Sequence, residues 1–81
     1  MALSKRTGGG TSLFEVIIES IDRVDPDGNG APKEAMLTDA TTHASGYSRV
    51  DVEDKFETMK RRGEIYVVPA DGEDRVKVAR L

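Results

Sequence analysis

The sequence predicts an α+β domain with three helices and a small antiparallel β-hairpin. A charged helix that begins at Ser48 gives way at Gly63 to two short β-rich runs, and Asp71-Gly72 separates these runs. The Asp-Gly pair suits a tight turn with positive φ. A capped helix followed directly by a hairpin is the end of a winged helix-turn-helix, in which the hairpin is the wing. We therefore expect residues 12–81 to form one such domain.

The first helix is predicted from Leu13 to about Val24. Ser12 and Glu15 have the spacing of a capping box at its start. Its apolar residues recur at helical spacing and form an inward stripe, namely Phe14, Ile17, Ile18, Ile21 and Val24, which Leu13 and Val16 widen. Residues 25–30 follow as a loop, because they are almost entirely turn formers.

A second helix is predicted from Lys33 to about Thr42. Pro32 precedes it, and the fixed φ of proline suits the first turn of a helix. The side chains expected to be buried on this helix are Ala35, Met36 and Ala40, with Leu37 and Ala44 as further candidates. Residues 45–47 then form the turn into the third helix.

The third helix has the clearest signals. Val52, Phe56 and Met59 form its apolar stripe, while Ser48 and Asp51 favour its start. Gly63 can adopt the left-handed conformation that ends a helix. The first strand is predicted as residues 65–68, closed by Pro69, and the second contains Val76 and Val78 on one face. The hairpin tip is then expected at residues 70–74.

The composition is that of one small globular domain. The chain has 81 residues, 37% of them hydrophobic and 33% charged, and it has no cysteine. A disulfide framework and thiolate metal sites are thereby excluded. No apolar run approaches the roughly 20 residues that span a membrane, so we expect a cytoplasmic protein. Residues 1–11, with three consecutive glycines, are expected to be a flexible linker or an added tail.

An enzyme is not expected from this sequence, nor any cofactor or metal. His43 is the only histidine, so a histidine cluster cannot form, and it is interpreted as a surface residue at a helix end. The loop at residues 25–30 starts like a calcium loop, but Met36 occupies the place of the bidentate glutamate at its twelfth position. Gly8-Gly9-Gly10 does not fit a phosphate-binding loop.

The charges are unevenly distributed along the chain. Residues 12–47 carry seven acids and two bases, whereas residues 48–81 carry eight of each. With Lys5 and Arg6 included, the net charge of the whole chain is −3. A pI near 5.1 argues against indiscriminate binding of nucleic acid. The candidates for contact with DNA or an acidic partner are Arg49, Lys60, Arg61, Arg62, Tyr66, Arg75, Lys77 and Arg80. The candidates for docking a protein are Glu15, Glu19, Asp22, Glu53 and Glu57.

Charge also disfavours base reading by the third helix. The third helix of a helix-turn-helix often enters the major groove. Here its first half offers Arg49, but it also carries acids that would meet the phosphates with like charge, namely Asp51, Glu53, Asp54 and Glu57. A weaker basic patch is expected where residues 60–62 approach Arg75 and Lys77. In the simpler interpretation, the same bases only cap the end of the third helix and keep the outer face of the sheet solvated.

Two short motifs suggest a family. With Gly30-Ala31-Pro32 before the second helix and Gly63-Glu64-Ile65-Tyr66 after the third, the chain resembles the C-terminal winged-helix domain of archaeal minichromosome maintenance (MCM) replicative helicases. The resemblance covers roughly residues 12–81. Members of that family often have an acidic residue and a proline after the tyrosine, whereas this chain has Val67-Val68-Pro69.

The resemblance implies a regulatory module without catalysis of its own. Its partners would be the ATPase domain of an MCM hexamer and an initiator ATPase at origins, with at most weak DNA binding, and the isolated domain would be a monomer. One alternative is a winged-helix transcription regulator that binds DNA through the wing and the basic end of the third helix. Another is an adaptor like the C-terminal winged helix of the replication protein A middle subunit.

Overall fold

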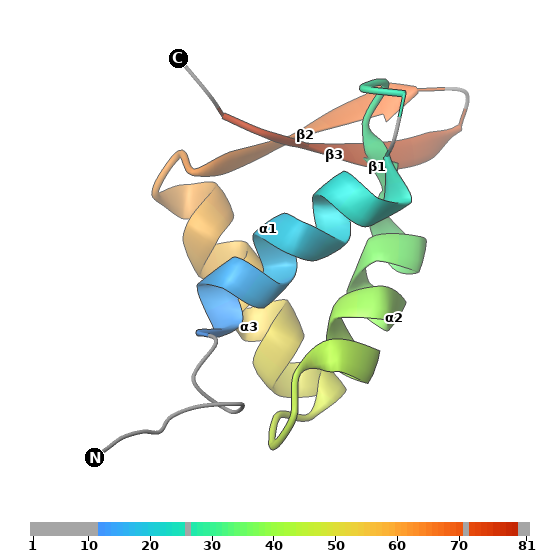
Figure 1. The fold of residues 1–81 in the computed structure, drawn as a ribbon. Coiled ribbons are helices and arrows are strands. Elements are labelled where there is room, and N and C mark those ends of the chain that lie inside the picture. Colours follow the sequence, from blue (N-terminus) through green and yellow to red (C-terminus); the bar gives the residue numbers. More distant parts are fainter. Residues whose placement is uncertain (1–11, 26, 71, 80–81) are drawn as a thin grey trace.

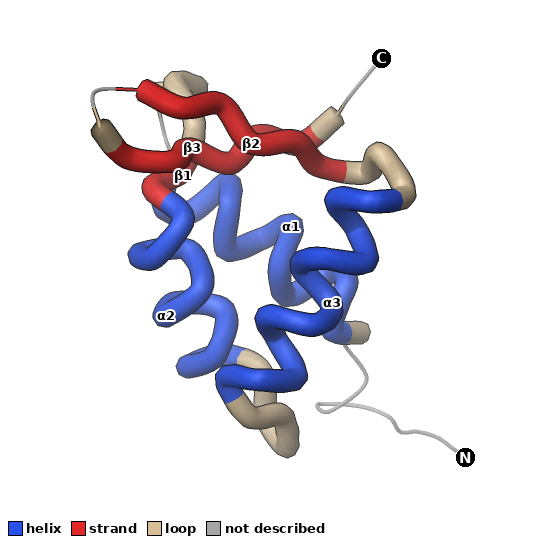
Figure 2. The backbone as a smooth tube through the Cα atoms, turned by 180° about the vertical axis from the view of Figure 1, so that it is seen from behind, coloured by secondary structure: helices blue, strands red, loops and turns tan. Residues whose placement is uncertain are grey.

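The computed structural model describes residues 12–25, 27–70 and 72–79. This part of the chain is an α+β domain in which a small antiparallel sheet lies across one end of three helices (Figure 1). Seen from behind, the strands form one layer and the helices the other (Figure 2). The expected linker at residues 1–11 lies outside the described residues. The elements are α1 (Leu13–Val24), β1 (Ala31–Pro32), α2 (Lys33–His43), α3 (Arg49–Arg61), β2 (Ile65–Ala70) and β3 (Glu73–Val78).

Both long helices begin with the predicted side-chain caps. At α1 the Ser12 hydroxyl accepts a hydrogen bond from the Glu15 backbone N–H at 3.2 Å, and the Glu15 carboxylate accepts one from the Ser12 N–H. At α3 the same reciprocal pair joins Ser48 and Asp51. Each cap satisfies backbone donors that have no partner inside the helix.

The end of α3 turns the chain directly into the sheet. Gly63 has φ +78°, its N–H donates to the Lys60 carbonyl, and the Glu64 N–H donates to the Met59 carbonyl. This pair of bonds is a Schellman motif, and it confirms the predicted role of Gly63. Strand β2 therefore begins at Ile65, two residues after Gly63. The hairpin is thus positioned by the motif that ends α3.

The sheet has the order β1-β3-β2, with both pairs antiparallel. Ile65 pairs with Val78, and Val67 with Val76. These four side chains form the inner face, packed on the core, while the alternate residues point away from the helices. The outer face carries Tyr66 opposite Lys77, and Val68 opposite Arg75.

Strand β1 was not predicted. Ala31 pairs with Val76 and Pro32 with Arg75, so the segment before α2 is the third strand of the sheet. Its two residues are too few to show a strand pattern, and Pro32 is equally compatible with the start of a helix. The structure combines both roles, because Pro32 ends β1 and is also the residue that precedes α2.

The hairpin is longer and its loop shorter than predicted. Strand β2 continues through Pro69 to Ala70, and β3 begins at Glu73. Proline is tolerated there because β2 is an edge strand. Two residues separate the strands, and the second of them, Gly72, has φ +81°. Asp71 lies outside the described residues.

The core lies between the sheet and all three helices. Its largest side chains include Phe56, Ile17 and Met36, each at most 1% exposed. From α2 the core receives Met36, Leu37 and Ala40, but Ala35 is exposed, so the expectation that Ala35 is buried was wrong. The error arose because α2 has no pronounced apolar stripe to indicate its inward face.

The loop between α1 and β1 is shaped by Asp25 and Gly30. The two carboxylate oxygens of Asp25 accept hydrogen bonds from the backbone N–H groups of Asn29, at 2.8 Å, and Gly30, at 2.7 Å. The Gly30 carbonyl in turn accepts a hydrogen bond from the Arg75 guanidinium at 3.1 Å. The loop is thus fastened at one end to α1 and at the other to β3.

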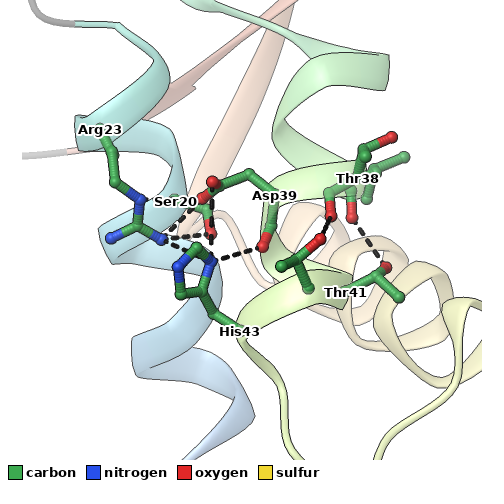
Figure 3. A network of polar contacts seen from close by, with 8 residues as sticks. Ser20, Arg23, Thr38, Asp39, Thr41 and His43 are labelled. Carbon is green, nitrogen blue, oxygen red and sulfur yellow. Dashed lines mark hydrogen bonds and ion pairs between the residues drawn. The ribbon is translucent and has the colours of Figure 1, made fainter.

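A polar network joins α1 to α2 at the molecular surface (Figure 3). The Arg23 guanidinium donates to one Asp39 carboxylate oxygen through Nη2, at 2.6 Å, and through Nε, at 3.1 Å. Hydrogen bonding to Arg23 is the main reason that the pKa of Asp39 lies below its ordinary value near 3.8. His43 Nδ1 lies 2.9 Å from the Asp39 backbone carbonyl and 3.3 Å from Arg23.

Candidate functional site

The first half of α3, where a base-reading helix would contact DNA, has no free arginine. Arg49 Nη2 lies 2.7 Å from Glu34 Oε1 on α2, and its Nε lies 2.9 Å from Glu53 Oε2 on α3. The hydrogen bond to Glu34, followed by that to Glu53, raises the pKa of Arg49. Its guanidinium therefore joins α2 to α3, and both its charged partners belong to the domain itself.

The same half of α3 presents carboxylates to solvent. Asp51 is occupied by the helix cap, whereas Glu53 and Asp54 are exposed beside it. Glu57 follows one turn later and forms an ion pair with Lys60 at 3.1 Å. These carboxylates would repel an approaching phosphate.

A pocket of about 360 Å³ lies between α2 and α3. Its floor consists of Leu37 and Phe56, which are 2% and 1% exposed. Its rim carries one base, Lys33, whose Nζ lies 5.5 Å from the centroid of the Phe56 ring. Four carboxylates complete the lining, those of Glu34, Glu53, Asp54 and Glu57.

The bases at the end of α3 are mostly paired with their neighbours. Lys60 pairs with Glu57 and lies over the Phe56 ring at 5.9 Å, while Arg61 donates to the Thr58 hydroxyl. Arg62 lies 3.7 Å from Glu64. Each of these three bases therefore has a side-chain partner within three residues of it.

The outer face of the hairpin gathers the other basic candidates around an aromatic ring. Tyr66, 46% exposed, lies opposite Lys77, and the partly exposed Val68 lies opposite Arg75. Arg75 donates to Glu73 at 2.9 Å as well as to the Gly30 carbonyl. Arg80 lies outside the described residues. The register thus places Tyr66, Arg75 and Lys77 on one face, as the alternation along the strands indicates.

The basic candidates divide between two elements. Lys77 lies near the start of β2, which follows the end of α3, whereas Arg75 lies two residues nearer the hairpin tip and is fastened to the loop before β1. Residues 60–62 contact acids or a hydroxyl near the end of α3, and Arg75 contacts Glu73 and the Gly30 carbonyl.

The acidic candidates on α1 are exposed, but their surroundings differ. Glu15 is part of the helix cap, so its carboxylate is already hydrogen-bonded. Glu19 and Asp22 are exposed on the middle and last turns of the same helix. The other docking candidates, Glu53 and Glu57, lie on α3 and line the pocket. The docking candidates therefore form two acidic areas, one on α1 and one on α3.

Two features of these surfaces were not predicted from the sequence. Asp39 was assigned no role, because its partner Arg23 is 16 residues away and the α1–α2 packing brings the two together. The pocket was also missed, although the position of Phe56 among Glu53, Asp54 and Glu57 is visible in the sequence. The contribution of α2 to its lining depends on the angle between the helices, which the sequence does not show.

Comparison of the chain with protein-family models, with curated proteins and with solved structures gave no match. The described residues contain no group of three histidine, cysteine, aspartate or glutamate side chains that could hold a metal ion. Over the same ranges, no helix has the length and apolar character required to cross a membrane.

Proposed function

We propose that residues 12–81 form a winged helix-turn-helix module that regulates an MCM-type replicative helicase through protein contacts and has no catalytic activity itself. The order of the elements supports this assignment, since α2, a short turn and α3 are followed directly by a hairpin. The two motifs of the family resemblance lie at the junctions of the fold. Gly30-Ala31-Pro32 forms the passage through β1 into α2, and Gly63-Glu64-Ile65-Tyr66 forms the passage from α3 into β2.

The proposal rests on the ion pairs that Arg49 forms. It is the one arginine on the first half of α3, and it is held between Glu34 and Glu53. With that base engaged, this half of the helix carries three acids, Asp51, Glu53 and Asp54, against Lys55, so its net charge is negative. Such a surface favours a basic protein surface over phosphate. The proposed partners are the ATPase domain of an MCM hexamer and an origin initiator ATPase, and DNA binding is weak.

A chimaera tests the proposal. In an archaeal MCM hexamer, the natural C-terminal domain is replaced by residues 12–81 on the same linker, and ATPase and unwinding rates are compared with those of the intact and the truncated hexamer. We expect the chimaera to regain the regulation that truncation removes. An unrelated small domain on the same linker is the control, and equal recovery with that domain would contradict the proposal.

A second candidate function is a winged-helix regulator that binds DNA through the hairpin. The observation that favours it is the shared outer face of Tyr66, Arg75 and Lys77. Two phosphate contacts there would give a slope of about −2 in a plot of log affinity against log salt. Duplex binding is measured by fluorescence anisotropy over a range of salt concentrations. No affinity at low salt would exclude this candidate, and a slope near −2 that Lys77→Ala reduces would support it.

A further inference from the structure

The pocket between α2 and α3 combines an apolar floor with an acidic rim. Its floor is formed by Leu37 and Phe56, and its rim carries four carboxylates against one lysine. Its volume of about 360 Å³ lies near the lower end of the roughly 300–1,000 Å³ typical of small-molecule pockets. A space of this size suits one long side chain, and the charge of the rim favours a positive one.

Three of the rim carboxylates already have a basic partner, and one does not. Arg49 pairs with Glu34 and Glu53, and Lys60 pairs with Glu57. Within the described ranges, the Asp54 side chain forms neither an ion pair nor a hydrogen bond. The rim therefore has one uncompensated carboxylate, and it lies beside the apolar floor.

Two cations of the chain itself already lie near the Phe56 ring. Two ammonium groups of the chain lie within cation–π range of the ring, Lys33 Nζ at 5.5 Å and Lys60 Nζ at 5.9 Å from the centroid. Lys33 comes from α2 and Lys60 from α3, so both elements that line the pocket direct a cation to the same ring. Lys33 itself lines the pocket, so it occupies the place that an incoming cation would take.

We propose that this pocket receives an arginine or lysine side chain from a basic segment of a partner protein. The charged end of that side chain would pair with Asp54, and its aliphatic part would take the place of Lys33 above Leu37 and Phe56, which are otherwise 2% and 1% exposed. A phosphate is disfavoured by the acidic rim, and the rim carboxylates do not converge as a metal site, since the described residues contain no such group. The inference rests on the proposed function as a protein-contact module, and it specifies that the partner segment is basic.

The test is a titration of the 15N-labelled 81-residue chain with two probes, N-acetylarginine amide and a short blocked peptide containing two arginines. We expect saturable NMR shift changes at residues 33–37 and 53–57 for both probes. Asp54→Asn should weaken binding of the peptide about tenfold. The matched control, Asp27→Asn, removes an equal charge from an exposed loop residue outside the pocket, and it should leave the affinity unchanged.

A second variant tests whether Lys33 competes for the site. Lys33→Gln should strengthen peptide binding severalfold, because it clears the Phe56 ring, whereas Lys55→Gln makes the same change of charge on α3 outside the pocket lining and should have a smaller effect. Equal effects of the two lysine variants, or of the two aspartate variants, would overturn the proposal, because they would indicate a general effect of charge. Shift changes centred on α1, or no saturable binding, would overturn it as well.

The outcome is separable from that of the chimaera experiment. The titration uses the chain alone, so a negative result would remove the pocket assignment and leave the helicase proposal to be judged by its ATPase assay. Localised peptide binding together with a chimaera that fails to restore regulation would keep the pocket as a basic-peptide site and remove the helicase context.

Discussion

Gly30 is the position where a side chain is least compatible with the fold. Its φ is +102°, and a Cβ built there would lie 2.8 Å from Arg75 Cβ on the neighbouring strand. Gly30→Ala should therefore combine the cost of a left-handed backbone with a steric clash, and we expect a loss of about 2–3 kcal/mol in the free energy of unfolding. Urea denaturation followed by circular dichroism measures this loss.

The matched control for that substitution is Gly28→Ala in the same loop. Gly28 also has positive φ, at +78°, but a Cβ there would meet nothing within 4 Å. Its cost should be limited to the backbone conformation, about 1 kcal/mol. Equal losses for the two variants would show that the contact with Arg75 has no energetic consequence.

Asp39 should make part of the stability dependent on pH. Its pKa is lowered in the folded protein, chiefly by the hydrogen bond from Arg23. The stabilisation is therefore complete above the pKa of Asp39 in the unfolded chain, near 3.8, and is lost as the pH falls through the lower folded-state value. Because Arg23 is 45% exposed, solvent screening keeps this contribution small.

Asp39→Asn tests this dependence by unfolding at pH 7 and at several values below pH 4. We expect the variant to be less stable than the natural chain at pH 7 and to approach it at the lowest pH, where the natural carboxylate is protonated. Asp27→Asn is the control, since that exposed loop residue takes no part in the network. A constant difference between Asp39→Asn and the natural chain across the whole range would contradict the assignment.

At the scale of single elements, α3 depends on its cap. The Ser48 hydroxyl accepts a hydrogen bond from the Asp51 N–H at 3.2 Å, and the Asp51 carboxylate accepts one from the Ser48 N–H at 3.0 Å. Ser48→Ala should cost about 1 kcal/mol of unfolding free energy. Ser45→Ala, in the preceding turn, removes an exposed hydroxyl outside any helix cap and should cost almost nothing. Similar losses in chemical denaturation would show that the cap does not stabilise the domain.

The elements differ in how clearly the sequence indicates them, for physical reasons. The helices α1 and α3 were predicted closely, because a cap, an apolar stripe and a stop signal coincide in each. Strand β1 was missed, since its two residues acquire their role only through pairing with Val76 and Arg75. The inward face of α2 was partly misassigned at Ala35, because packing against α1 and α3 decides its orientation.

In the candidate site, too, the sequence indicates local features but not those that depend on tertiary packing. Alternation along the strands placed Tyr66, Arg75 and Lys77 on one face, because that periodicity is local. The engagement of Arg49 by Glu34 could not be predicted, since those residues lie 15 positions apart and meet only when α2 packs on α3. In the folded domain this arginine links two helices, a role that only tertiary packing reveals.

At the scale of the whole molecule, one core should make the domain unfold as a unit. Val76 is fully buried at the centre of the sheet, where it pairs with Ala31 and Val67. It belongs to the core cluster, to which all three helices contribute side chains. Val76→Ala should cost about 2–3 kcal/mol. Val68→Ala, on the outer face of the sheet and 38% exposed, should cost no more than about 0.5 kcal/mol.

The same core predicts that helices and sheet are lost together in the Val76→Ala variant. The chain has two tyrosines and no tryptophan, so Tyr47→Phe leaves Tyr66 on β2 as the only fluorescent reporter. In that background, far-ultraviolet circular dichroism follows the helices and Tyr66 fluorescence follows the sheet. We expect both signals to change at one urea midpoint, lowered equally by Val76→Ala. A sheet transition that precedes the helical one would show that the hairpin is a separate unit, attached to the helices without sharing their stability.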